Sequence, residues 1–189
     1  GQNPAVRPGP NEGPPLMVEG TLYVPTGTHQ VCAIDAATGK TRWTFDPRAG
    51  GNVHRGLAYW ADGSQRRLFL PTRDSYLYAL DPETGRPIPG FGDNGRVDLA
   101  SGMRRTFDRG LMSYTSPPSV CGNVIVVGSA VDDFQERREM PPGDVRGYDA
   151  RTGRLLWTFH TVPQAGEFGN ETWKEGSWRY TGNTNVWTW

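Results

Sequence analysis

The sequence predicts an all-β fold, and three observations carry that prediction: a repeated turn phrase, short strand-like runs around each copy, and no helical period. The phrase is Asp-x-x-Thr-Gly, and it begins at Asp35, Asp81 and Asp149. Each copy follows a short run of β-branched or aromatic residues, a pattern typical of strands joined in hairpins. No segment repeats apolar residues at a helical spacing, so we expect little helix.

The spacing of the three phrases predicts a repeat architecture. A segment that recurs along a chain is a unit that buries its apolar face against its neighbours. The first two phrases lie one four-stranded propeller blade apart, for which roughly 40 to 50 residues is usual. The second step is longer, because insertions occur near residues 90–115 and 132–142. We therefore expect one domain, a partial β-propeller of about three four-stranded antiparallel blades, at roughly 16–60, 61–118 and 119–189.

The repeated phrase has a structural explanation. Its Asp and Thr side chains can satisfy the amides of a tight turn, and its Gly supplies a positive φ. A Trp follows the first and third copies, at Trp43 and Trp157, and can dock between adjacent blades. The last strand of the second unit is expected to be degenerate, because Pro89 stands in place of that Trp. We interpret the three Asp residues of the phrase as structural and not catalytic.

The composition excludes several functional classes. The 20 basic and 20 acidic residues balance and are mixed along the 189-residue chain, so a nucleic-acid partner is not expected. No apolar run approaches the roughly 18 residues that indicate a membrane span. The two cysteines, Cys32 and Cys121, are far apart and lack a metal-binding spacing. We expect two buried thiols, and a disulfide between them remains the alternative.

Residues 33–43 resemble the tryptophan-docking motif of quinoprotein dehydrogenases, which hold pyrroloquinoline quinone (PQQ) and a divalent metal at the centre of an eight-bladed propeller. Further matches follow in the family's order. The segment from Arg55 to Trp60 resembles its RG-x-x-Y-W sequence, and residues 115–118 and 128–134 resemble segments of the membrane glucose dehydrogenase branch. Many alcohol dehydrogenases of the family carry adjacent cysteines shortly before the Arg. Their absence here, with the second insertion, favours the glucose or polyol branch.

The resemblance implies a cofactor site built from Glu12, Arg55, Thr115 and Trp187. Arg55 matches the Arg that binds the cofactor, and a guanidinium can fork onto a carboxylate of PQQ. Glu12 and Thr115 match cofactor-binding positions, and Trp187 matches the Trp on which the quinone ring lies. The alternatives are structural: a surface Arg, a terminal Glu, a turn Thr and a blade-core Trp.

The resemblance also implies a metal site. Asp133 stands where the family places a metal-ligating acid, with its neighbour Asp132 as the alternative residue. Carboxylates suit Ca²⁺ or Mg²⁺, which prefer oxygen ligands, although a solvated loop acid is the other reading. The family's catalytic Asp and a second metal ligand lie in a later blade. We therefore expect this chain to be an N-terminal part of a larger dehydrogenase, inactive by itself.

Two functional hypotheses follow. The first is a periplasmic PQQ-dependent dehydrogenase that oxidises a sugar, polyol or other alcohol and passes electrons to a quinone or a cytochrome. The second is a cofactor-free, PQQ-like propeller that serves as an assembly or interaction scaffold. A scaffold would keep the docking phrase but would have no reason to keep the RG-x-x-Y-W segment, so the enzyme is favoured.

Overall fold

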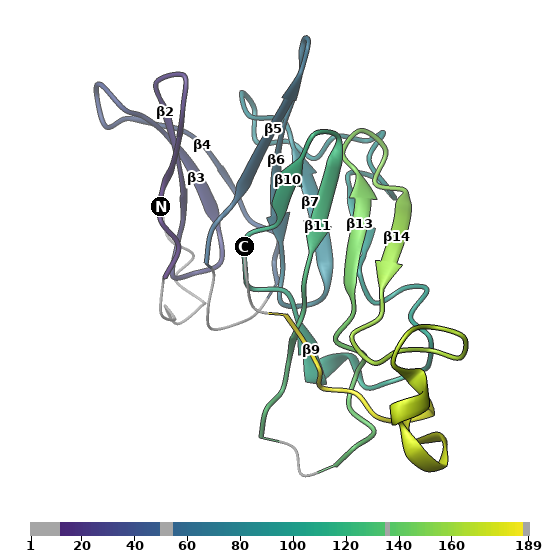
Figure 1. Ribbon diagram of the computed structural model, residues 1–189. Coiled ribbons are helices and arrows are strands. Elements are labelled where there is room, and N and C mark those ends of the chain that lie inside the picture. Colours follow the sequence, from purple (N-terminus) through teal and green to yellow (C-terminus); the bar gives the residue numbers. More distant parts are fainter. Residues whose placement is uncertain (1–11, 50–54, 135–136, 187–189) are drawn as a thin grey trace.

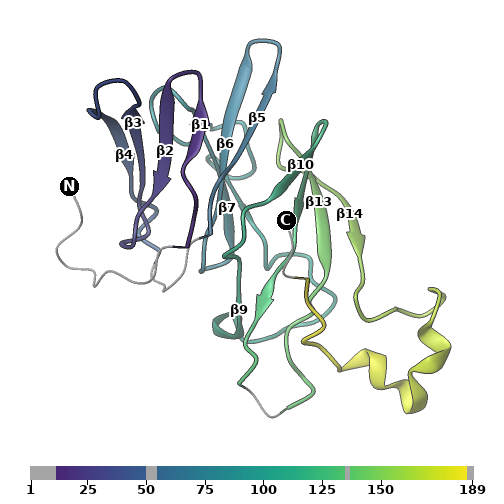
Figure 2. The same ribbon diagram turned by 60° about the vertical axis from the view of Figure 1, so that its left-hand side comes forward.

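A computed structural model describes residues 12–49, 55–134 and 137–186, and in that part strands dominate. Three four-stranded antiparallel sheets stand side by side in chain order (Figures 1 and 2). The first sheet is β1 (Leu16–Val18), β2 (Thr21–Pro25), β3 (Val31–Asp35) and β4 (Thr41–Phe45). The second is β5 (Ala58–Asp62), β6 (Gln65–Pro71), β7 (Tyr76–Leu80) and β8 (Arg96–Asp98). The third is β10 (Ser119–Cys121), β11 (Val124–Val127), β13 (Val145–Asp149) and β14 (Leu155–Phe159).

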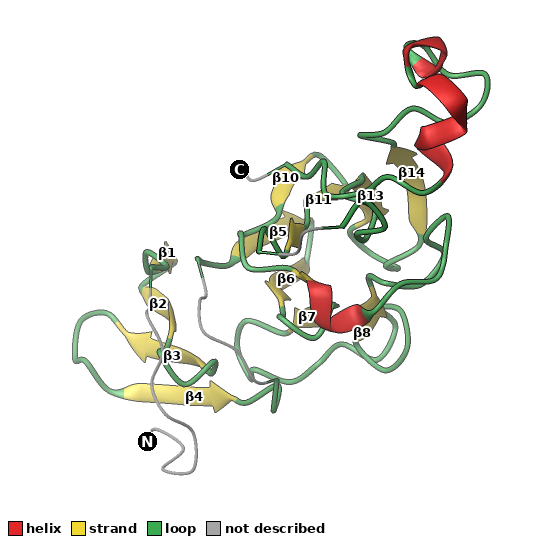
Figure 3. Ribbon diagram, turned by 90° about the horizontal axis from the view of Figure 1, so that it is seen from below, coloured by secondary structure: helices red, strands yellow, loops and turns green. Residues whose placement is uncertain are grey.

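The remaining elements are few. A two-stranded sheet pairs β9 (Met112–Ser113) with β12 (Ala130–Val131), and β9 lies below the large sheets in Figure 1. The described helices are short 3₁₀ segments: η1 (Arg109–Leu111), η2 (Asn170–Thr172) and η3 (Lys174–Arg179). Seen from below, η2 and η3 lie beside the third sheet and far from the first (Figure 3). The all-β fold with four-stranded antiparallel units is therefore confirmed.

The apolar core lies between neighbouring sheets. Because successive side chains of a strand point to opposite faces, β6 serves two clusters at once. Its Leu68 and Leu70 join a cluster with the first sheet, and Phe69 joins a cluster with the third. The three side chains are fully buried. The second sheet is thus covered on both faces, as an inner blade of a stacked array must be.

The repeated phrase forms the same turn each time. In the first copy the Asp35 Oδ1 accepts hydrogen bonds from the Thr38 amide at 2.9 Å and the Thr38 hydroxyl at 2.8 Å. Asp81 and Asp149 make the same pair of bonds to Thr84 and Thr152. Hydrogen bonds from Arg42 and then Thr38 lower the pKa of Asp35 to about 2. Each carboxylate is thus engaged by its own turn.

Trp43 docks the first sheet onto the second. Its ring lies so close to the next repeat that a Cβ on Gly85 would be 2.5 Å from Trp43 Cε3. The indole Nε1 donates to the Pro82 carbonyl at 2.9 Å. The turn that follows Asp81 therefore packs against the Trp43 ring at Gly85, which has no side chain. The same turn supplies the Pro82 carbonyl as the acceptor for the indole N–H.

At the interface between the second and third units, no tryptophan among the described residues occupies the position that Trp43 takes at the first interface. Trp60 contacts the third unit from β5 instead, and its Nε1 donates to the Gly122 carbonyl at 3.0 Å. A Cβ on Gly153 would lie 2.6 Å from Val97 Cγ2 and 3.2 Å from Phe91 Cζ. Phe91 is fully buried, and the Gly92 amide donates to the Thr152 carbonyl at 2.9 Å. Phe91 and Val97 together fill the place that Trp43 fills at the preceding interface.

Two sequence expectations are wrong in detail. The last strand of the second sheet does not lie around Pro89 but at Arg96–Asp98, where it pairs with Tyr76–Tyr78. Pro89 has no N–H to give to a ladder, and only the single bridge from Leu80 to Pro87 forms there. The expected first blade boundary at residue 60 also falls inside β5, which pairs with the second sheet.

The cysteines differ from the expected pair of buried thiols. Both are free, which answers the disulfide alternative. Cys32 is half-buried in β3, with its Sγ 3.4 Å from the Thr44 hydroxyl. Cys121 is exposed, because it ends β10 immediately before the turn at Gly122.

Candidate functional site

A cavity of about 350 Å³ brings together residues from segments that are far apart in sequence. It is lined by Arg55, Arg73, residues 110–113, Thr115 and residues 130–134. Strands β9 and β12 form one wall, and the turns that enter β5 and leave β6 supply the two arginines. Long connections hold these polar groups on a rigid sheet framework, which is where binding residues commonly occur.

Arg55 lies at the entrance to β5 and contacts two other predicted cofactor residues. Its Nε donates to Glu12 Oε2 at 3.0 Å, and its Nη1 reaches the Thr115 hydroxyl at 3.4 Å. The Arg55 amide also donates to the Thr115 carbonyl at 2.9 Å, which fixes the two backbones together. The structure thus places Glu12, Arg55 and Thr115 in one cluster. Trp187, the fourth predicted residue, lies outside the described residues.

The two predicted metal residues follow β12 and line the same cavity. The Asp132 amide donates to the Leu111 carbonyl at 2.9 Å, and its Oδ1 accepts from the Phe134 amide at 2.9 Å. Asp133 is exposed. Within residues 12–49, 55–134 and 137–186, no group of three or more His, Cys, Asp or Glu side chains comes together to hold a metal. A hard cation takes six or more oxygen ligands, so these carboxylates could supply only part of its coordination.

Sequence reasoning missed Arg73. It lies in the turn between β6 and β7 and adds a second guanidinium to the cavity wall. The only sequence signal is that this turn and Arg55 lie at the same end of an antiparallel pair, one entering β5 and the other leaving β6. That signal becomes visible only when the strand pairing is known.

The donor set of the cavity fits PQQ with a divalent metal. PQQ carries three carboxylates, and Arg55 and Arg73 offer two guanidinium groups that can each bind a carboxylate through two hydrogen bonds. The hydroxyls of Ser113 and Thr115 can bond to oxygens in the ring plane. Asp132 and Asp133 supply the oxygen ligands that a hard cation prefers.

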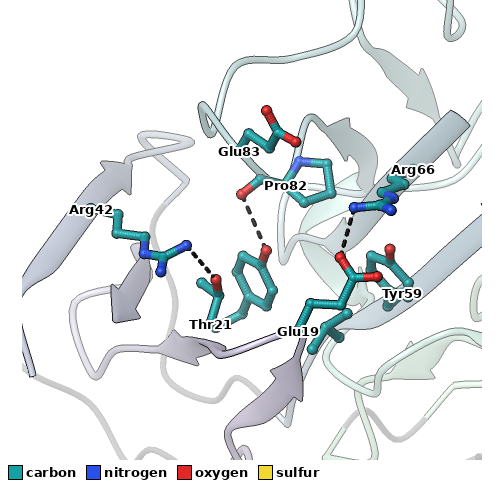
Figure 4. Close-up of a pocket in the computed structure, with 9 residues that line it drawn as sticks. Glu19, Thr21, Arg42, Tyr59, Arg66, Pro82 and Glu83 are labelled. Atoms are coloured by element: carbon teal, nitrogen blue, oxygen red, sulfur yellow. Dashed lines mark hydrogen bonds and ion pairs between the residues drawn. The ribbon is translucent and has the colours of Figure 1, made fainter. Parts of the chain in front are cut away.

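A second cavity, of about 290 Å³, lies between the first two sheets (Figure 4). Several of its charged or polar side chains already have partners within the chain. Arg66 pairs with Glu19 at 2.7 Å, and Arg42 bonds to Asp35 and to the Thr21 hydroxyl. Tyr23 donates to the Pro82 carbonyl at 3.2 Å. The Arg66–Glu19 and Tyr23–Pro82 contacts join the first two sheets. Because these groups are used in structural contacts, this cavity is a weaker candidate for ligand binding.

None of the helical segments in the described part of the chain has the length and apolar character that crossing a bilayer requires.

Comparison with known proteins identifies close relatives. The chain is 33% identical over 175 residues to quinoprotein glucose dehydrogenase A of Acinetobacter calcoaceticus, an alignment that covers 80% of this chain and 22% of that protein. The structure superposes on the quinohemoprotein alcohol dehydrogenase of Comamonas testosteroni with a TM-score of 0.67 and 25% identity, over 87% of this chain and 23% of that one. It superposes on a europium-containing methanol dehydrogenase with a TM-score of 0.59 and 26% identity, over 82% and 25%.

These matches show what kind of unit the chain is. It spans about a fifth of the length of the curated relative, 22% in the alignment above. The family model for the PQQ-type glucose/ethanol/alcohol dehydrogenase β-propeller domain matches residues 2–189, nearly the whole chain. The chain therefore belongs to the β-propeller family of PQQ-dependent glucose and alcohol dehydrogenases.

Proposed function

We propose that this chain supplies part of the PQQ and metal site of a periplasmic dehydrogenase that oxidises a sugar, polyol or other alcohol. The observation that carries the proposal is the cavity that gathers Arg55, Thr115, Asp132 and Asp133 from separate segments. The matched relatives are dehydrogenases of glucose and of alcohols, so the proposed substrate class is a hydroxyl compound. Electrons would leave to a quinone or a cytochrome.

The residues of the cavity would bind and orient the cofactor. When bound, PQQ supplies the electron acceptor for oxidation of the hydroxyl carbon. Arg55, held by Glu12 and Thr115, would direct its guanidinium at a cofactor carboxylate. Because the Arg55 and Thr115 backbones are bonded to each other, the guanidinium starts from a fixed position and loses little freedom on binding.

Asp133, with its neighbour Asp132, would hold the metal in the same cavity. One Asp132 oxygen already accepts from the Phe134 amide, which shapes the loop and leaves Asp133 as the more available ligand. Ca²⁺ or Mg²⁺ held there would polarise oxygens of the bound ligand as a Lewis acid. We assign no residue of this chain as the group that accepts the substrate proton.

The test is titration of the full-length protein with PQQ in the presence of Ca²⁺, with quenching of tryptophan fluorescence as the measure of binding. Dye-linked oxidation of a sugar or an alcohol is then measured as the activity. Arg55→Met should raise the Kd for PQQ about 10- to 100-fold, because a charged hydrogen bond is lost. Arg66→Met is the matched control, because Arg66 pairs with Glu19 away from the cavity. Absence of PQQ binding and of oxidation in the wild-type protein would overturn the enzyme and leave the cofactor-free scaffold.

The metal assignment is tested separately. Asp133→Asn should raise the Ca²⁺ concentration needed for half-maximal PQQ binding to EDTA-treated protein, because a neutral amide is a weaker ligand for a hard cation than a carboxylate. Glu83→Gln, an exposed acid at the far end of β7, should leave it unchanged. Equal Ca²⁺ requirements for wild type and Asp133→Asn would contradict the assignment.

A further inference from the structure

The turn between β6 and β7 presents Arg73 from a well-anchored backbone. The Thr72 amide donates to the Tyr76 carbonyl at 2.8 Å, and the Ser75 amide donates to the Thr72 carbonyl at 3.1 Å. Ser75 is fully buried, and its hydroxyl donates to the Met112 carbonyl at 3.3 Å. Met112 belongs to β9, which lines the cavity. The turn is therefore fastened to the cavity wall on one side and to its own hairpin on the other.

The Arg73 guanidinium is available to a ligand. In the described part of the chain, it makes no hydrogen bond and no ion pair. The neighbouring cations are engaged: Arg109 forms a two-pronged pair with Asp98 at 2.9 and 2.8 Å, and Arg55 bonds to Glu12 and Thr115. An exposed, unpaired guanidinium at a cavity wall is a strong candidate to bind an anion.

No group in the described part of the chain forms an ion pair with Arg73. Asp74 accepts from the Thr72 hydroxyl at 2.5 Å within the turn. His29 lies near enough that burial first, and then the charge of Arg73, lower its pKa. The lowered pKa favours the neutral imidazole, so His29 adds no second positive charge beside Arg73. Arg73 therefore lines the cavity as a cation without an ion-pair partner among the described residues, together with Asp132 and Asp133.

We propose that Arg73 binds a carboxylate of the ligand that occupies this cavity, beside the carboxylate bound by Arg55. The inference rests on the function proposed above and extends it to a second cationic contact. A guanidinium binds a carboxylate through two parallel hydrogen bonds. Two sources share this chemistry: a carboxylate of PQQ, or a carboxylate on an acidic substrate such as a uronic acid.

The experiment compares Arg73→Met and Arg73→Lys with Arg86→Met in the full-length protein. Arg86 is the matched control, because it is exposed and lies at the opposite end of β7. The measurements are the Kd for PQQ with saturating Ca²⁺, and the KM for glucose and for glucuronate. Thermal midpoints equal to that of the wild type establish that the variants fold.

If the carboxylate belongs to PQQ, Arg73→Met raises the Kd for PQQ about 10- to 100-fold, with partial recovery in Arg73→Lys and none of the effect in Arg86→Met. If it belongs to the substrate, the Kd for PQQ is unchanged and the KM rises for glucuronate but not for glucose. Wild-type binding of PQQ with neither change in Arg73→Met overturns this inference alone. Failure of the wild-type protein to bind PQQ overturns the proposed function and this inference with it.

Discussion

Alanine at Gly85 should destabilise the protein much more than alanine at Gly63, although both glycines have a positive φ. The φ angles are 69° at Gly85 and 58° at Gly63, so each substitution places a side chain in the left-handed region at a cost of about 1–2 kcal/mol. Gly63 lies in the hairpin between β5 and β6, where an added Cβ meets no described atom within 4 Å. At Gly85 the Cβ would lie 2.5 Å from Cε3 and 2.6 Å from Cδ2 of Trp43.

Trp43 has little freedom to move away from the added methyl group. Its Nε1 is bonded to the Pro82 carbonyl at 2.9 Å, and its ring packs against Tyr23 with 5.9 Å between centroids. Overpacking of this kind costs about 1–3 kcal/mol. With the backbone cost, Gly85→Ala should lose about 2–5 kcal/mol. The difference between Gly85→Ala and Gly63→Ala is then the packing cost alone, about 1–3 kcal/mol.

Urea unfolding of the protein that carries this chain, followed by tryptophan fluorescence, measures the free energy of unfolding of each variant. Trp43→Ala combined with Gly85→Ala provides the internal check, since without the ring the alanine at position 85 should cost only the backbone term. A difference between the Gly85 and Gly63 variants below about 0.5 kcal/mol would refute the docking argument.

Two further predictions concern single hydrogen-bonded side chains. Bonds from Arg42 and Thr38 hold the pKa of Asp35 at about 2, below its ordinary 3.8, so the stability it contributes is present above pH 3.8 and is lost as the pH falls toward 2. Unfolding midpoints of Asp35→Asn should therefore fall less steeply across that window than those of wild type, and equal slopes would contradict the assignment. Trp60→Phe should cost about 1–3 kcal/mol in urea unfolding, because the indole Nε1 loses its bonds to the Gly122 carbonyl at 3.0 Å and to Asn123 Oδ1 at 3.2 Å and the smaller ring leaves a gap in the core; no measurable loss would contradict this role of Trp60.

Local features of this fold can be predicted from the sequence, whereas features that depend on strand pairing cannot. The turn at Asp35 is predictable because its donors and acceptors lie within five residues of one another. The position of β8 was missed, because its pairing with β7 depends on the reversal between Gly92 and Gly95, both at positive φ, and not on a pattern around Pro89. Strand β8 itself is only three residues long.

The residues of the candidate site likewise depend on strand pairing, which the sequence alone does not reveal. Arg55 and Thr115 came from a family resemblance, and their contact at 3.4 Å bridges two segments that no sequence period connects. Arg73 was missed because an arginine in a hairpin turn resembles any surface arginine until the β6–β7 turn is seen to bond to Met112. Trp187 stays a prediction. The composition of the site depends on which turns converge at one end of the sheets, and that is a tertiary property.

The interface between the second and third sheets shows which partner in a blade contact is replaceable. Phe91 and Val97 pack against Gly153 at this interface, as the indole of Trp43 packs against Gly85 at the interface between the first and second sheets. The residue in the turn is glycine in both cases. The bare turn, rather than the aromatic ring, is thus the common requirement. The glycine position therefore accepts either an indole or a phenylalanine with a valine, and a search that begins from the glycine turn would find units that lack the docking tryptophan.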